Sequence, residues 1–292
     1  MIIWSIAKTT VGDAMRKKVL QIFLVIAMGL IVISLSFSQT LTFSANQGST
    51  MDLELVKSFG LGLMALAGWL IALVMGVSLI PQEIERRTIY TILSKPVKRY
   101  EFIIGKFLGA ILTLAICVAL MGIVFVGVVA AKAYLAHPAA TSIQGAAKQG
   151  LDTAGAAAQK IPVIDANMLI GVVMVFLQFF VLVSVVMMFS VVCTPTVNFF
   201  LGLGVYIVGL LSSTSLTLAN SKDAGVFVKV FYTAIHWVIP NFDKFNVTNV
   251  LLYPEMPVGS IALYTLKMTL YGLLFSLGAM LVSIIIFEGK EV

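Results

Sequence analysis

Met168–Val192 reads MLIGVVMVFLQFFVLVSVVMMFSVV and carries no charged residue. A helix of ~20 apolar residues spans the ~30 Å hydrocarbon core of a bilayer. Similar runs recur in this chain of 292 residues, of which 60% are hydrophobic and 11% charged, whereas roughly a quarter of a soluble domain is charged. The runs are continuous rather than alternating, which excludes a β-barrel. The sequence therefore predicts an all-α polytopic membrane protein.

We predict six transmembrane helices in one transmembrane domain, residues 19–292. Their approximate bounds are Val19–Phe43, Phe59–Ile80, Ile103–Ala131, Met168–Val192, Val197–Ala219 and Ile261–Phe287. Basic residues gather before the first span and between the second and third, and such loops are typically cytoplasmic. This pattern predicts that both termini are cytoplasmic. Val226–Pro240 is apolar but short and contains Lys229 and His236, so it is either a helix in the outer interface or a seventh span.

The segment before the first span, residues 1–18, is predicted to be an amphipathic helix lying along the cytoplasmic interface. Its apolar residues fall at helical spacing: Ile3, Ile6, Ala7, Thr10 and Ala14. The alternative is a frayed tail. Among the outer loops, His137–Pro162 is predicted to be flexible or weakly helical. Asn220–Ser260 contains Pro240–Asn246 and Tyr253–Pro257, which suggests an ordered cap with turns.

The sequence lacks the residues that several classes of membrane protein require. No Asp or Glu lies within the six predicted spans, which argues against an ion-coupled carrier. Gln178 and Asn198 are expected to hydrogen-bond between helices, and Lys106 to reach the interface from a span end. The chain has no His-Glu-x-x-His pattern, no phosphate-binding loop and no regular metal-ligand spacing. We therefore predict no catalytic residue, cofactor or metal in this chain, and no nucleic-acid partner.

Pro81–Lys106 is a charged segment between two apolar runs, too short for a domain and too charged to cross a bilayer. Charges of both signs surround large apolar residues, as in protein interfaces. The charged members that open the segment are Glu83, Glu85, Arg86 and Arg87, and the apolar ones are Ile84, Ile89, Tyr90, Ile92 and Leu93. The simpler alternative is an ordinary basic cytoplasmic loop.

The sequence from Glu83 to Lys106, Glu-x-Glu-Arg-Arg-Thr-Ile-x-x-Ile-Leu-Ser-Lys-Pro-Val-Lys-Arg-x-Glu-Phe-Ile-Ile-Gly-Lys, resembles the loop between the second and third spans of type-2 (ABC-2) ABC transporter permeases. Within that family, the chain is most similar to permeases for multicopper-enzyme maturation, including nitrous-oxide reductase maturation. Ile239–Val247, Tyr271–Ser276 and Ile286–Lys290 carry further similarity.

The resemblance implies a permease subunit of a bacterial or archaeal cytoplasmic membrane. It implies two separate ABC ATPase subunits that bind ATP and Mg²⁺, a second permease copy or paralogue, and surrounding membrane lipids. The loop would be the coupling helix that fits a groove of the ATPase. The coupling residues carried over are Glu83, Glu85, Arg86, Arg87, Thr88, Leu93, Pro96 and Arg99.

Export or membrane extraction of an unidentified substrate is the leading hypothesis. The alternative is a membrane scaffold or regulatory anchor that transports nothing. An ion-coupled carrier and a membrane enzyme are less favoured, because the residues that each needs are missing.

Overall fold

The computed structural model describes residues 2–42, 49–78, 98–147, 166–212, 233, 239–246 and 258–289. Apart from one short 3₁₀ turn, η1 (Asp243–Phe245), the elements described in these ranges are α-helices: α1 (Ile2–Arg16), α2 (Lys18–Thr42), α3 (Ser49–Ser78), α6 (Arg99–Ala147), α7 (Ala166–Ser190), α8 (Pro195–Leu210) and α12 (Val258–Glu288). The all-helical prediction is therefore confirmed for the described residues.

Four helices are long and apolar enough to cross a membrane: Val56–Val77, Arg99–Lys132, Met168–Ser190 and Ile261–Glu288. The α1–α2 pair, which bends by 67°, supplies a fifth if it is counted as one span. The remaining apolar helix, α8, has 16 residues, fewer than the ~20 that a span requires. The described residues thus show four to five candidate spans, and the count of six and the orientation stay predictions.

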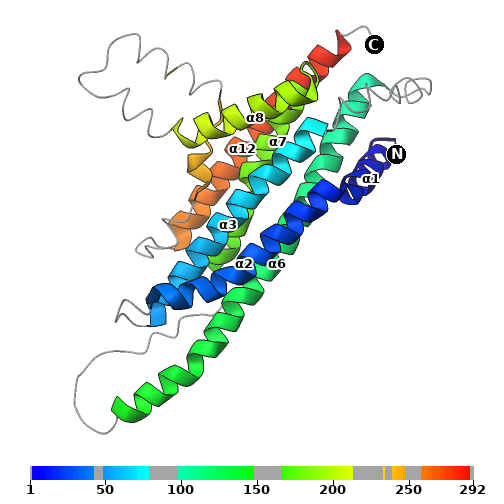
Figure 1. Cartoon of the computed structure of the whole chain (residues 1–292). Coiled ribbons are helices and arrows are strands. Elements are labelled where there is room, and N and C mark those ends of the chain that lie inside the picture. Colours follow the sequence, from blue (N-terminus) through cyan, green and yellow to red (C-terminus); the bar gives the residue numbers. More distant parts are fainter. Residues whose placement is uncertain are drawn as a thin grey trace.

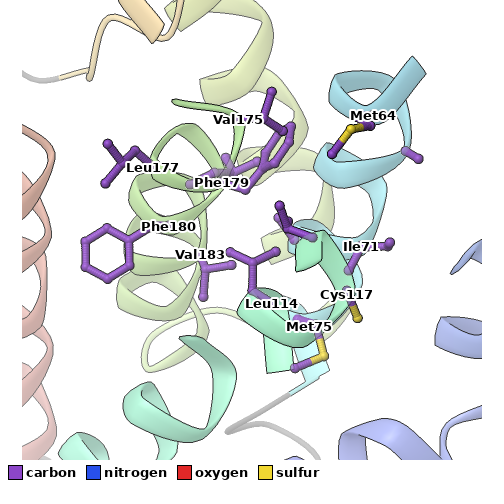
Figure 2. Close-up of a cluster of buried hydrophobic side chains, with 14 of the residues drawn as sticks. Met64, Ile71, Met75, Leu114, Cys117, Val175, Leu177, Phe179, Phe180 and Val183 are labelled. Atoms are coloured by element: carbon purple, nitrogen blue, oxygen red, sulfur yellow. The ribbon is translucent and has the colours of Figure 1, made fainter. Parts of the chain in front are cut away.

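α7 lies at the centre of the bundle and packs against α3, α6, α8 and α12. Of its candidate span, 72% is buried inside the bundle, whereas only 28% of the α12 span is. Figure 2 shows the core where Met64 and Ile71 of α3 face Phe179 and Val183 of α7, with Leu114 of α6 beside them. A helix that is apolar on all sides belongs in such a central position, because every face meets another apolar surface.

α6 is the longest helix and projects beyond the rest of the bundle at the end remote from its start (Figure 1). It continues for 15 residues past Lys132, through His137 and Pro138 to Ala147. Within His137–Pro162, which was expected to be flexible or weakly helical, residues 137–147 are helical, and residues 148–162 lie outside the described residues. Several alanines in this stretch favour helix, which outweighs the single hydrogen bond that Pro138 removes.

A break at Lys17 turns the chain from α1 into α2. The side-chain amide of Gln21 donates to the backbone carbonyl of Met15 at 2.9 Å, which satisfies one of the carbonyls left open where α1 ends. The helix before this bend, α1, packs against the first turns of α6. The buried residues of α1 are Ala7, Thr10 and Ala14, three of those that the sequence placed on its apolar face.

Gly105 and Gly109 of α6 allow this close approach. A Cβ at Gly105 would lie 2.8 Å from Cβ of Ile6, and one at Gly109 would lie 2.5 Å from Cβ of Thr10. Real Cβ atoms essentially never approach a non-bonded atom this closely, so this approach of the two helices requires glycine at both positions. This spacing of small residues lets two helix backbones approach in membrane proteins. The Gly-x-x-x-Gly motif formed by Gly105 and Gly109 is therefore part of the surface of α6 against which α1 packs.

We predict that Gly109→Leu weakens the α1–α6 contact and lowers the melting temperature of the detergent-purified protein. The added side chain has no room beside Thr10, and overpacking of this kind costs about 1–3 kcal/mol. Gly127→Leu is the matched control on the same helix, because a Cβ there meets nothing within 4 Å. Equal melting temperatures for the two variants would contradict the assigned contact.

Candidate functional site

Most of the predicted coupling residues lie outside the described residues. Glu83, Glu85, Arg86, Arg87, Thr88, Leu93 and Pro96 belong to residues 79–97, for which no structural statement is made. Val226–Pro240, the other unsettled segment, is also almost entirely outside them. Arg99 is described, and it is the first residue of α6. The candidate site can therefore be built from the helix that the charged segment enters.

The start of α6 is capped by its own acidic residue. The backbone N–H of Lys98 donates to Oε2 of Glu101 at 3.2 Å. Glu101 thus occupies the third helical position and reaches back to the residue before the helix, as in one half of a capping box. Its negative charge also opposes the positive end of the helix dipole. These two effects fix the helix start at Arg99, with Lys98 as the residue before it.

The first turns of α6 are joined to the last turn of α12. Nη1 of Arg99 donates to the backbone carbonyl of Glu288 at 3.2 Å. One turn further into the bundle, the rings of Phe102 and Phe287 stack with centroids 6.1 Å apart, and each side chain is 1% exposed. We call Arg99, Phe102, Phe287 and Glu288 the α6–α12 clamp. It joins two segments that are 189 residues apart in the sequence.

Lys106 extends this cluster toward the bundle interior. Its side chain is 6% exposed, and Nζ lies 5.8 Å from the centroid of the Phe102 ring. A cation over an aromatic face gains about 0.5–2 kcal/mol, and more where water is excluded. The sequence predicted that Lys106 reaches the interface from a span end. In the structure this side chain instead packs over the clamp and is largely buried.

Together, α1, the first turns of α6 and the last turn of α12 form one junction at a single end of the bundle (Figure 1). α1 sits on Gly105 and Gly109, and α12 is held through Phe102 and Arg99. Each contact involves a different residue within the first three turns of α6. A force applied to the start of α6 would therefore act on three helices at once.

A second ordered feature is a short segment, residues 239–246, which we call the wedge. Phe242 and Phe245 are 0% and 1% exposed. The backbone N–H of Phe242 donates to the carbonyl of Gly209 in α8 at 3.1 Å. The wedge thus lies against the last turn of α8. Of the ordered cap predicted for Asn220–Ser260, the turn at Pro240–Asn246 is found, and Tyr253–Pro257 lies outside the described residues.

Two tyrosines of α12 hold the wedge from the other side. The hydroxyl of Tyr271 accepts from the backbone N–H of Asn241 at 3.1 Å, and the hydroxyl of Tyr264 donates to the carbonyl of Lys244 at 2.6 Å. The ring of Phe245 also packs on that of Tyr271, with centroids 6.1 Å apart. These contacts join a non-helical stretch to the bundle and satisfy part of its backbone, as apolar surroundings require.

Aromatic rings link the wedge to the bundle core. Tyr206 of α8 lies between Trp69 of α3 and Phe242 of the wedge, with centroids 5.6 Å from each. Phe179 of α7 lies 6.4 Å from the same ring. Tyr206 is therefore the point at which three helices and the wedge meet.

Gln178 and Asn198 were predicted to hydrogen-bond between helices. Asn198 is fully buried, and neither its side-chain nitrogen nor its oxygen has a partner among the described residues. Gln178 is 4% exposed and likewise makes no side-chain hydrogen bond within the described part of the chain. The predicted interhelical hydrogen bonds are thus not formed in this part of the structure. Gln178 lines a pocket instead.

No group of three or more His, Cys, Asp or Glu side chains suited to a metal ion occurs within the described ranges. The two cysteines, Cys117 and Cys193, are both free, and Cys117 is buried in the core between α3, α6 and α7.

Sequence reasoning placed Arg99 in the coupling region but missed its partner Glu288 and the stack of Phe102 on Phe287. A signal for them was present, because Ile286–Lys290 was one of the stretches with family similarity. No sequence pattern marked Tyr206 as a functional residue, since it is one aromatic residue within an apolar run.

The described part of the chain is an apolar helical bundle with four to five candidate membrane spans. A family model described as "ABC-2 family transporter protein" matches residues 4–292. The chain belongs to this family and is the permease component of an ABC transporter, a component that normally works with ATPase subunits. No curated protein matches the chain.

We predict that Phe287→Ala destabilises the purified protein by about 3 kcal/mol, because it removes a ring from a packed site. Unfolding by heat in detergent, followed by loss of the monodisperse elution peak, measures this. Leu281→Ala is the control on the same helix, at a side chain that is 57% exposed. If the two variants melt alike, the clamp does not stabilise the junction.

Proposed function

We propose that this permease couples ATP hydrolysis by separate ATPase subunits to export, or extraction from the membrane, of a substrate. The observation that carries the proposal is the junction at the start of α6. Residues 81–98 lead directly into a helix end that is joined both to α1 and to α12. A displacement of the charged segment would therefore be passed to three helices rather than absorbed by one.

In this proposal, Pro81–Lys98 and Arg99 face the cytoplasm and meet the ATPase. The coupling residues are those named from the sequence: Glu83, Glu85, Arg86, Arg87, Thr88, Leu93, Pro96 and Arg99. The apolar members would enter a groove, and the surrounding charges would set orientation and partner choice. ATP and Mg²⁺ would bind to the partner, since the sequence has no phosphate-binding loop.

Both termini would then be cytoplasmic, in the cytoplasmic membrane of a bacterium or archaeon, with α1 lying along the inner interface. Its exposed side chains suit this place, because Trp4, which is 64% exposed, can sit among headgroups and Lys8 can reach the lipid phosphates. The outward face of α12 is apolar, with Leu266 and Ile285 66% and 69% exposed. Such a face contacts lipid or a second permease copy.

A double charge reversal tests the coupling role. We expect Arg86→Glu with Arg87→Glu to reduce the amount of ATPase that co-purifies from the native host by about tenfold or more, because like charges placed opposite each other cost several kcal/mol. The permease itself should still insert in the membrane in normal amount. The ATPase is identified by mass spectrometry and by ATP hydrolysis of the purified complex.

The matched control is Lys222→Glu with Lys229→Glu, which makes the same charge change in a loop predicted to face outward. It should leave the ATPase bound. Equal losses in both variants, or no loss in either, would refute the coupling role. The scaffold alternative predicts a stable complex whose ATP hydrolysis is the same with and without the permease.

A further inference from the structure

The pocket beside Gln178 lies between α3, α7, α8 and the wedge and has a volume of about 270 Å³. One wall is apolar, with Leu61 and Ala65 of α3 opposite Val175 of α7. Phe245 of the wedge also lines the pocket. Because the wedge is held by Tyr264 and Tyr271, this wall is fixed before any ligand arrives, and such preorganisation favours binding.

Two polar side chains line the same pocket without using their hydrogen-bonding groups. Gln178 and Tyr206 are 4% and 8% exposed, and neither side chain makes a hydrogen bond to any described residue. In apolar surroundings an amide or hydroxyl without a partner costs at least about 1–3 kcal/mol. A ligand that offers one acceptor and one donor, or a hydroxyl that is both, would remove this cost.

The pocket opens at the surface of the bundle. Gly62 and Leu66 of α3 belong to its lining and are exposed, Leu66 by 51%. α3 contains a candidate membrane span that includes both residues. An opening at the depth of this candidate span would face the lipid, so a molecule dissolved in the bilayer could enter sideways.

No charged side chain is among the described residues that line the pocket. An ionised group placed there would lose its hydration without gaining a counter-charge, so a charged end of a ligand is excluded. An aliphatic chain, by contrast, fits between Leu61, Ala65 and Val175.

We propose that this pocket binds the chain of a membrane-dissolved amphiphile, with an uncharged hydroxyl, ester or amide group of that molecule hydrogen-bonded to Gln178 and Tyr206. Two sources share this chemistry, a resident bilayer lipid and the transported cargo. Binding itself does not depend on the coupling segment, so this proposal stands or falls separately from the proposed function.

The natural reporter is Trp69, whose ring stacks on that of Tyr206 with centroids 5.6 Å apart. Trp4→Phe and Trp237→Phe leave Trp69 as the only tryptophan of the chain, which has three. The purified permease in detergent is titrated with a long-chain alcohol that carries bromine near its chain end, because bromine quenches tryptophan fluorescence at short range. We expect saturable quenching, distinct from the linear quenching that partition into the micelle produces.

Gly62→Leu tests the pocket directly. A Cβ at Gly62 meets nothing within 4 Å, so a side chain can leave the backbone there without displacing a neighbour, and a leucine would occupy the opening. It should abolish the saturable quenching. Gly278→Leu on α12 is the matched control, since a Cβ there also meets nothing within 4 Å, and it should leave the quenching unchanged. Ala65→Leu fills the pocket from a second position if Gly62→Leu does not purify as a monodisperse protein.

Gln178→Leu should keep the shape of the pocket and weaken the binding of the alcohol by about threefold to tenfold, which is the contribution of one hydrogen bond. Purely linear quenching in the parent protein, or equal saturation in Gly62→Leu and Gly278→Leu, would overturn the proposal. In the complex with the ATPase, cargo would raise ATP hydrolysis in the parent but not in Gly62→Leu. A resident lipid would leave hydrolysis unchanged while the quenching difference remains.

Discussion

Gly105 and Gly109 bring α1 so close to α6 that a methyl group at either position would collide with Ile6 or Thr10. One to two turns nearer the start of the same helix, Phe102 and Arg99 meet the last turn of α12. Two helices, one from each end of the sequence, are thereby fixed to the same short piece of α6. The charged segment that precedes α6 enters the bundle at this point.

The wedge depends on a different physical constraint. In lipid, backbone groups outside helices need partners within the protein, and the wedge receives them from Gly209, Tyr264 and Tyr271. Phe242 of the wedge packs on Tyr206, and Phe245 lines the pocket between α3, α7 and α8. A pocket with two unused polar side chains remains. One end of the structure is thus arranged for transmitting force and another part for holding an apolar molecule.

The sequence predicted the helical class, and the continuous apolar runs are the reason. It also indicated the ordered turn at Pro240–Asn246, because Pro-Asn has local meaning. It did not predict that α6 continues to Ala147, since the predicted span ends near Ala131 and the small and polar residues from His137 onward suggested a loop. Nor could it pair Phe102 with Phe287 or place Tyr206 at the centre of an aromatic cluster, because such contacts depend on how distant helices pack. Those are properties of the tertiary structure that no local pattern encodes.

The central claim is that the junction moves as one body when the ATPase acts on it. A direct test replaces Arg99 and Glu288 by cysteine in a protein without Cys117 and Cys193, and joins the new thiols with a short reducible cross-linker. ATP hydrolysis of the complex with its ATPase is then measured before and after cross-linking. Our account predicts the same permease-dependent hydrolysis in both states. Hydrolysis that stops on cross-linking and returns on reduction would show that the clamp must open, and would contradict it.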